Sequence, residues 1–148
     1  MASKELIEKI KKDIEEDKRT YLQNCNKENY HEYCEAGRTL FKKGWDILER
    51  RENSWYVNFT EKALEAKQNK ETETEKQILE MALNDNIGFP YAYERLAVLY
   101  SKEKDFLKAY NVCKKWFSSI YWGIPNMVTK TLKILDRMEK LEKKLDKK

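Results

Sequence analysis

The sequence predicts an all-α protein built from antiparallel helical hairpins. Only four glycines and two prolines occur in 148 residues, which leaves few places where the chain can turn. Long helices need few turns, whereas a β-sandwich needs a turn about every 10 residues. Charged residues make up 38% of the chain and hydrophobic residues 41%, and this balance predicts a folded core beneath a heavily charged surface. We expect a single helical domain over residues 1–148.

The N-terminal part, residues 1–53, is predicted to form a helical hairpin. Apolar residues recur at spacings of three, four and seven in both of its segments, as in amphipathic helices. Ser3 suits the N-cap of the first helix. Gly37 and Gly44 lie on the apolar stripe of the second, although a glycine costs about 1 kcal/mol against alanine within a helix. Their position predicts that another helix crosses closely there, because a missing Cβ lets two backbones approach.

Residues 54–122 are predicted to form two further hairpins. Apolar residues mark one face of each of four segments, and polar runs separate the segments. The first of these hairpins is marked by Trp55, Phe59, Ala63, Ala66, Ile78, Leu79, Ala82 and Leu83. Between the hairpins, Gly88 suits a left-handed residue after a helix, and Pro90 suits the first turn of the next one. With the helix expected at the C-terminus, the chain is predicted to contain seven helices.

The last helix, within residues 125–148, combines an apolar seam with an excess of positive charge. Apolar residues recur there at near-heptad spacing from Val128 to Leu145. Residues 126–148 hold eight Lys or Arg and four Asp or Glu, and this difference of four equals the whole net charge of +4. A solvated helix face accounts for these charges most simply. The same features also suggest binding of nucleic acid through a basic stripe, or a homodimer through the seam.

The spacing of large and small residues between Pro90 and Trp116 carries the most information. Ala97 and Ala109 are small at the points where the two helices of a hairpin would cross. The large residues that would surround this crossing are Tyr93, Leu96, Tyr100 and Phe106. In this pattern the stretch resembles a tetratricopeptide repeat, a helical hairpin of about 34 residues.

The resemblance is specific over residues 90–116 and weak over residues 55–86. In the weak part, Lys62 and Glu75 stand where the family has Leu and Ala. Trp116 also departs from the family pattern, which has a small residue at that position, and this departure predicts a looser or differently angled contact with the following helix. The resemblance implies a short α-solenoid that has N-terminal helices and a C-terminal capping helix.

The resemblance also implies a function, because such solenoids have a concave groove that holds a peptide or a helix of a partner protein. The positions that correspond to the family's groove are Tyr91, Glu94, Val98, Ser101 and Lys102. Family members that clamp a C-terminal carboxylate have Lys and Asn in the groove. Glu94 and Val98 occupy two of those places, so we do not expect that activity. The chain is therefore predicted to be a protein-binding module, as an adaptor, regulator or inhibitor.

Enzymatic and metal sites are not expected. Cys25, His31 and Cys34 lie close in sequence, but a structural zinc site takes four ligands in a recognised spacing, and no fourth ligand is near. No Gly-rich loop is present to bind a phosphate, and no nucleophile has a base and an orienting group beside it. We expect no cofactor. Three scattered cysteines without a signal peptide indicate a cytoplasmic protein with reduced thiols, and no apolar run of about 18 residues predicts a membrane span.

Overall fold

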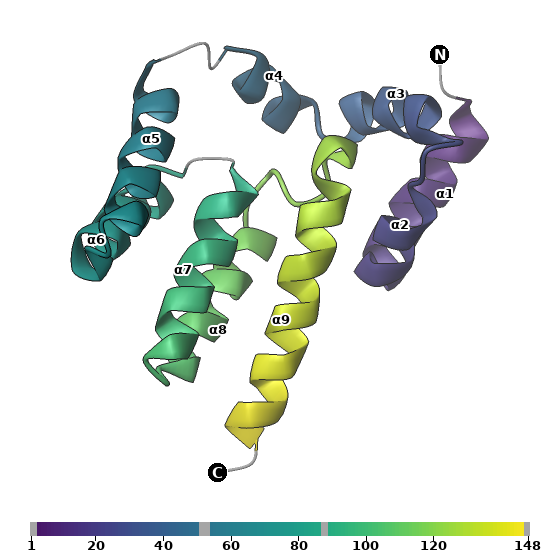
Figure 1. The fold of residues 1–148 in the computed structure, drawn as a ribbon. Coiled ribbons are helices and arrows are strands. Elements are labelled where there is room, and N and C mark those ends of the chain that lie inside the picture. Colours follow the sequence, from purple (N-terminus) through teal and green to yellow (C-terminus); the bar gives the residue numbers. More distant parts are fainter. Residues whose placement is uncertain (1–2, 51–53, 87–88, 147–148) are drawn as a thin grey trace.

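Every regular element in residues 3–50, 54–86 and 89–146, which the computed structural model describes, is helical (Figure 1). This confirms the predicted all-α class. Helices that follow one another from α5 to α9 pack as antiparallel neighbours. The elements of the described ranges are α1 (Lys4–Glu16), α2 (Lys18–Asn24), α3 (Tyr30–Leu40), α4 (Lys42–Arg50), α5 (Ser54–Gln68), α6 (Thr72–Asn84), α7 (Pro90–Lys102), α8 (Phe106–Phe117), the 3-10 helix η1 (Pro125–Met127) and α9 (Val128–Asp146).

The two hairpins α5–α6 and α7–α8 form where the sequence predicts them. Each has a short turn that contains a left-handed residue, Lys70 with φ 57° in the first and Lys104 with φ 62° in the second. Pro90 begins α7, as predicted, and the connection before it has its left-handed residue at Asn86. Gly88, which we expected to take that role, lies outside the described residues.

The described residues of the N-terminal part form four helices in place of the two expected. Ser3 caps α1 as predicted, because its Oγ accepts a hydrogen bond from the Leu6 amide at 3.1 Å. The backbone becomes extended at Asp17, with φ −155° and ψ 99°. The Asp17 carboxylate then caps α2 by accepting from the Arg19 amide at 3.0 Å. A side chain that bonds to the backbone in this way competes with continuation of the preceding helix.

The second break, at Phe41, has a tertiary cause. Phe41 ends α3 with φ −114°, and its ring lies 6.2 Å from that of Trp122 and 6.4 Å from that of Tyr21. Trp122 lies in the connection between α8 and α9. Gly37 and Gly44 pack against this connection as well. A Cβ on Gly37 would lie 2.7 Å from the Pro125 side chain. The predicted close approach at Gly37 is therefore confirmed, but the connection, not a crossing helix, makes it.

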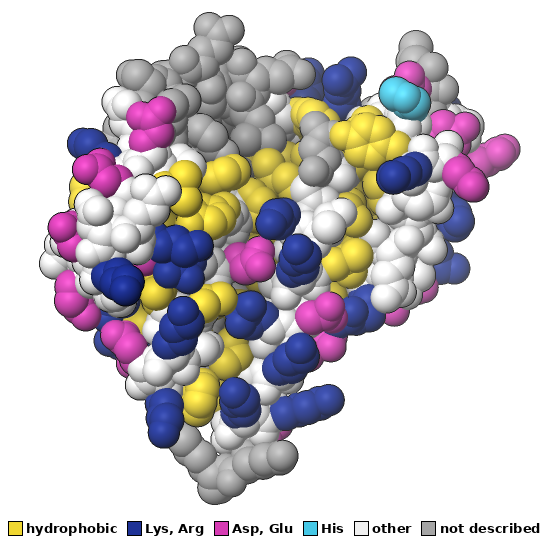
Figure 2. Space-filling view, viewed as in Figure 1, with side chains coloured by type: hydrophobic (Ala, Val, Ile, Leu, Met, Phe, Trp, Pro, Cys, Tyr) yellow, Lys and Arg dark blue, Asp and Glu magenta, His cyan; other side chains and the backbone are white. Residues whose placement is uncertain are grey.

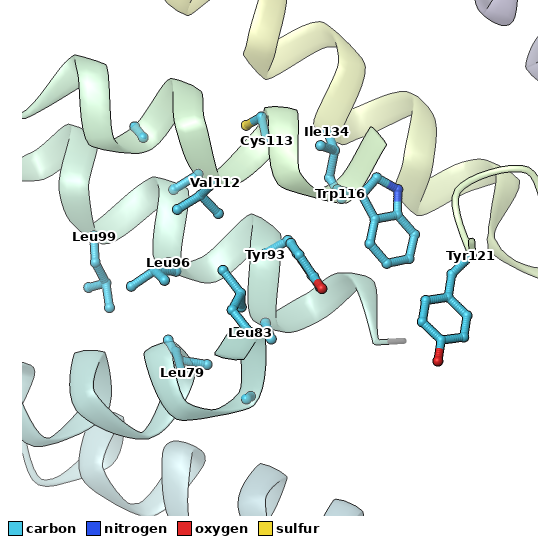
Figure 3. Packing of buried hydrophobic residues seen from close by; sticks show 14 of the residues in the cluster. Leu79, Leu83, Tyr93, Leu96, Leu99, Val112, Cys113, Trp116, Tyr121 and Ile134 are labelled. Carbon is cyan, nitrogen blue, oxygen red and sulfur yellow. The ribbon is translucent and has the colours of Figure 1, made fainter. Parts of the chain in front are cut away.

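Two apolar clusters hold the helices together, and α9 takes part in both. The N-terminal cluster consists of Ile10, Tyr21, Leu22, Tyr33, Ala36 and Val128, with Leu132 and Leu135 packed against it. The larger cluster draws residues from each of the helices α4 through α9 (Figure 3). It includes Phe59, Leu79, Leu96, Ala97, Ala109, Trp116, Ile134 and Leu141. The side chain of Trp55, one of the predicted apolar markers, lies outside the described residues.

The crossing of α7 and α8 has the small residues that the sequence indicates, since Ala97 and Ala109 are both fully buried in the larger cluster. The contact between Trp116 and the following helix, α9, is not loose. The Trp116 ring is fully buried, lies 4.9 Å from that of Tyr93 on α7, and its Nε1 donates to Thr131 Oγ1 on α9 at 3.2 Å. The indole therefore fills the space where α7, α8 and α9 meet.

Candidate functional site

The five residues predicted to line a groove lie on one side of α7. Tyr91, Glu94, Val98 and Ser101 are half-buried, and Lys102 is exposed. Residues three, four and seven apart share a helix face, which explains the arrangement. The opposite side of α7 is buried through Ala92, Tyr93, Leu96, Ala97 and Leu99. The predicted groove residues therefore form the less buried side of α7, although Tyr91 also packs against the larger cluster.

A buried ion pair fixes one border of this surface. The Arg95 guanidinium on α7 donates to both carboxylate oxygens of Glu75 on α6, at 2.7 and 3.1 Å, and Glu75 is only 1% exposed. This contact raises the pKa of Arg95. Beside it, Lys76 lies 2.7 Å from Glu103, and the Tyr100 hydroxyl donates to Glu80. The α6–α7 boundary is thus held by polar contacts, and Glu75, which departs from the repeat pattern, forms the most buried of them.

Three buried polar atoms in this region have no hydrogen-bond partner among the described residues. They are the hydroxyl oxygens of Tyr91 and Ser101 on α7 and Nε of Arg137 on α9. Burial raises the pKa of Tyr91, so its hydroxyl keeps its proton at neutral pH and remains a donor. A buried donor or acceptor without a partner costs about 1–3 kcal/mol, so these three atoms lower the stability of the free chain.

The charges of α9 are separated into two sides. Its cations at successive spacings of three, four, three and four are Lys130, Lys133, Arg137, Lys140 and Lys144. We call this set the α9 cation stripe. Within the ranges described above, none of the five forms an ion pair, and Lys144 lies over the Phe106 ring at 4.6 Å. Figure 2 shows Lys and Arg side chains gathered over α9 on this face.

Most acidic residues of α9 have partners on other helices. Asp136 and Glu139 both pair with Arg19 on α2, at 2.8 and 2.7 Å. Glu142 accepts a hydrogen bond from the Tyr110 hydroxyl on α8 at 3.0 Å. Three of the four acids on the helix are therefore bound on the sides that pack against α2 and α8. The cation stripe has a charge that its own helix does not neutralise.

The apolar seam of α9 packs within the chain. Leu132 and Leu135 lie against the N-terminal cluster, and Ile134 and Leu141 belong to the larger one. The near-heptad spacing that suggested a homodimer is thus explained by contacts with α2, α7 and α8. Association of two copies through this seam would require that packing to open.

The Cys and His residues singled out in the sequence show no sign of a metal or catalytic site in the described part of the chain. Cys25 and His31 line an open pocket of about 350 Å³ together with Tyr30 and Val128. Burial raises the pKa of the Cys25 thiol to about 11 and that of Cys113 to about 12. Both thiols are thus protonated and poorly nucleophilic at neutral pH. In the part of the chain that the structure covers, no group of three or more His, Cys, Asp or Glu is placed to hold a metal ion.

The described helices are all too short or too polar to span a lipid bilayer. Comparison of the chain with family models, with curated proteins and with solved structures finds no match in any of the three. The function must therefore be argued from the arrangement of the residues themselves.

Proposed function

We propose that the chain is a non-enzymatic protein-binding module, a short α-solenoid of the tetratricopeptide type that holds a peptide or helix of another protein. The binding surface consists of Tyr91, Glu94, Val98, Ser101 and Lys102 on α7 together with the α9 cation stripe. We call it the α7–α9 face. As an adaptor, regulator or inhibitor, the protein would act by binding a segment of its partner.

The arrangement of α7, α8 and α9 supports this surface as one unit. Helix α8 packs against both α7 and α9 and lies behind α7 in Figure 1. The sides of α7 and α9 that face away from α8 are thus turned in the same direction. Figure 2 shows apolar side chains between α9 and the α5–α6 hairpin, bordered by cations.

The observation that carries the proposal is the α9 cation stripe, which has no acidic partner among the described residues, beside the half-buried side of α7. Tyr91, Ser101 and Arg137 each have a buried polar atom without a partner in the described protein. A bound segment would cover Val98 directly and would reach these buried atoms only after their side chains turned outward. Tyrosine and arginine, here the half-buried Tyr91 and Arg137, are also residue types that often anchor protein interfaces.

Site-specific photo-crosslinking tests the proposal. A photoreactive phenylalanine analogue placed at Val98 reports on the α7–α9 face, and the same analogue at Leu107 serves as the control, because Leu107 is 57% exposed on α8. We expect Val98 to yield a defined protein adduct in the native host that Leu107 does not yield. The purified partner should then bind the wild-type chain more tightly than a folded variant with alanine at positions 91, 94 and 102. No adduct at Val98, or the same adduct at both positions, would refute the proposal.

The α9 cation stripe also supports a second candidate function, binding of nucleic acid. Phosphate contacts release counterions, so affinity for RNA or DNA would fall steeply with salt. Titration of labelled single-stranded RNA and duplex DNA at two ionic strengths measures this directly. Absence of binding at low salt would remove this candidate.

A further inference from the structure

We propose that the segment bound by the α7–α9 face is an acidic amphipathic helix whose Asp or Glu residues recur every three to four positions. This inference rests on the proposed function and names the chemistry of the partner. It follows from three features of the face: the unpaired charge of α9, the period of that charge, and the nature of the α7 surface beside it.

The unpaired charge determines the sign of the partner. Of the five cations in the stripe, none has an acidic partner among the described residues. The acids that would neutralise them on the same helix are held by Arg19 and Tyr110 on other sides. A row of like charges along one helix raises the electrostatic energy of the free protein. An acidic partner lowers that energy and is attracted from a distance.

The period of the charge determines the shape of the partner. The stripe runs from Lys130 to Lys144 with alternating steps of three and four residues, which at 1.5 Å per residue spans about 21 Å. A helix that lies alongside α9 presents one side chain to it every three to four residues, at the same spacing. An extended strand presents one every second residue, about 6.6 Å apart, so five of its side chains would span about 26 Å.

The α7 surface favours a protein over a phosphate chain. The half-buried Val98 and Tyr91 side chains offer apolar contact on the outer side of α7, which the charged phosphate groups of a nucleic acid cannot use. Glu94 adds negative charge to the same surface. A helix with apolar residues next to its acidic stripe matches this combination.

A synthetic peptide of about 18 residues serves as the probe, with Glu at alternating steps of three and four and Leu on the adjoining positions. Its control is an isomer of the same composition with the glutamates clustered at one end. The third probe is oligouridylate of about 20 nucleotides. Binding is followed by amide chemical shifts of the labelled protein, and affinity is measured at about 30 and 300 mM salt, where charges are weakly and strongly screened.

A matched pair of charge-reversed variants locates the effect. Lys133→Glu/Lys140→Glu alters the stripe, and Lys11→Glu/Lys12→Glu makes the same change in net charge at exposed positions of α1. We expect the periodic peptide to shift amides of α7 and α9 and to bind the stripe variant about tenfold more weakly than the control variant at low salt. Equal affinity of the two variants, equal affinity of the clustered isomer, or tighter binding of oligouridylate would overturn the inference.

The outcome is distinguishable from a failure of the proposed function. A partner that crosslinks at Val98 but binds both charge variants equally would leave the protein-binding function standing and would refute the acidic helix. No adduct at Val98 would refute the binding function itself. A crosslinked partner whose binding segment is acidic and helical, and whose affinity falls only with the stripe variant, would support both.

Discussion

The Glu75–Arg95 pair shows how one residue that breaks a repeat pattern can be explained by a contact far away in sequence. The Glu75 carboxylate is nearly inaccessible to solvent, and both of its oxygens accept hydrogen bonds from the Arg95 guanidinium. A carboxylate needs such partners in a buried position, since an unpaired buried charge is costly. The pair connects α6 to α7 and so contributes to the contact between the two hairpins.

We predict that Glu75→Gln lowers the free energy of unfolding by about 3 kcal/mol, because it leaves the Arg95 charge without its counter-ion. Urea denaturation followed by circular dichroism measures the change. The double variant Glu75→Met/Arg95→Met removes both charges and should recover most of the loss. A double variant as unstable as the single one would show that the pair's geometry, not its charge balance, supports the α6–α7 contact.

At the scale of the elements, periodicity predicted the long helices well and their interruptions poorly. The helices from α5 to α8 lie where apolar spacing and turn residues place them. The breaks at Asp17 and Phe41 were missed. Asp17 is a side-chain cap inside an otherwise continuous amphipathic pattern, so the pattern itself carries little sign of it. Phe41 ends α3 beside the rings of Tyr21 and Trp122, which are distant in sequence.

The candidate site was predictable to a similar degree. The repeat resemblance led to the outer side of α7, and the residues it indicated share that side in the structure. The spacing of the α9 cation stripe is visible in the sequence, but its lack of ion pairs is not. Asp136 pairs with Arg19 on α2, which lies more than a hundred residues away in the sequence, and therefore does not pair with Lys133. This pairing depends on where α2 packs. The unpartnered atoms of Tyr91 and Arg137 depend in the same way on their neighbours in space.

The glycines of the second N-terminal segment lead to an element-scale prediction about the connection between α8 and α9. A Cβ on Gly44 would lie 2.8 Å from the carbonyl oxygen of Ile120 and 3.2 Å from the Ile124 side chain. Backbone cannot yield as a flexible side chain can. Gly44→Ala should therefore lower the free energy of unfolding by about 1–3 kcal/mol, although alanine is the better helix former.

Lys43→Ala is the matched control for Gly44→Ala, because Lys43 is exposed on the same helix. Its free energy of unfolding should stay within about 0.5 kcal/mol of the wild type. Thermal or urea denaturation of the wild type, Gly44→Ala and Lys43→Ala measures these differences in the free energy of unfolding. A Gly44→Ala variant at least as stable as wild type would mean that the connection does not lie against α4 in solution.

At the scale of the whole molecule, the two apolar clusters depend on each other unequally. The N-terminal cluster uses Val128, Leu132 and Leu135 from α9 as part of its own core. The larger cluster draws its buried residues from α4 to α9 and from the connections between them, and takes none from α1 to α3. Loss of the first three helices would leave the larger cluster with all of its buried residues. Loss of α9 would remove residues from both clusters.

This asymmetry predicts how local damage spreads, and amide hydrogen exchange can follow it helix by helix. Leu22 and Ile134 are both fully buried, Leu22 in the N-terminal cluster and Ile134 in the larger one on α9. Truncation of either to alanine should cost about 2–5 kcal/mol locally.

Leu22→Ala should speed exchange in α1, α2 and α3 while α7 and α8 keep their protection. Ile134→Ala should speed exchange in α7 and α8 and also in α2, because all three helices pack on α9. If Leu22→Ala weakened protection in α7 and α8 as much as in α1 and α2, the chain would unfold as one unit, and the α7–α9 face could not persist without the N-terminal helices.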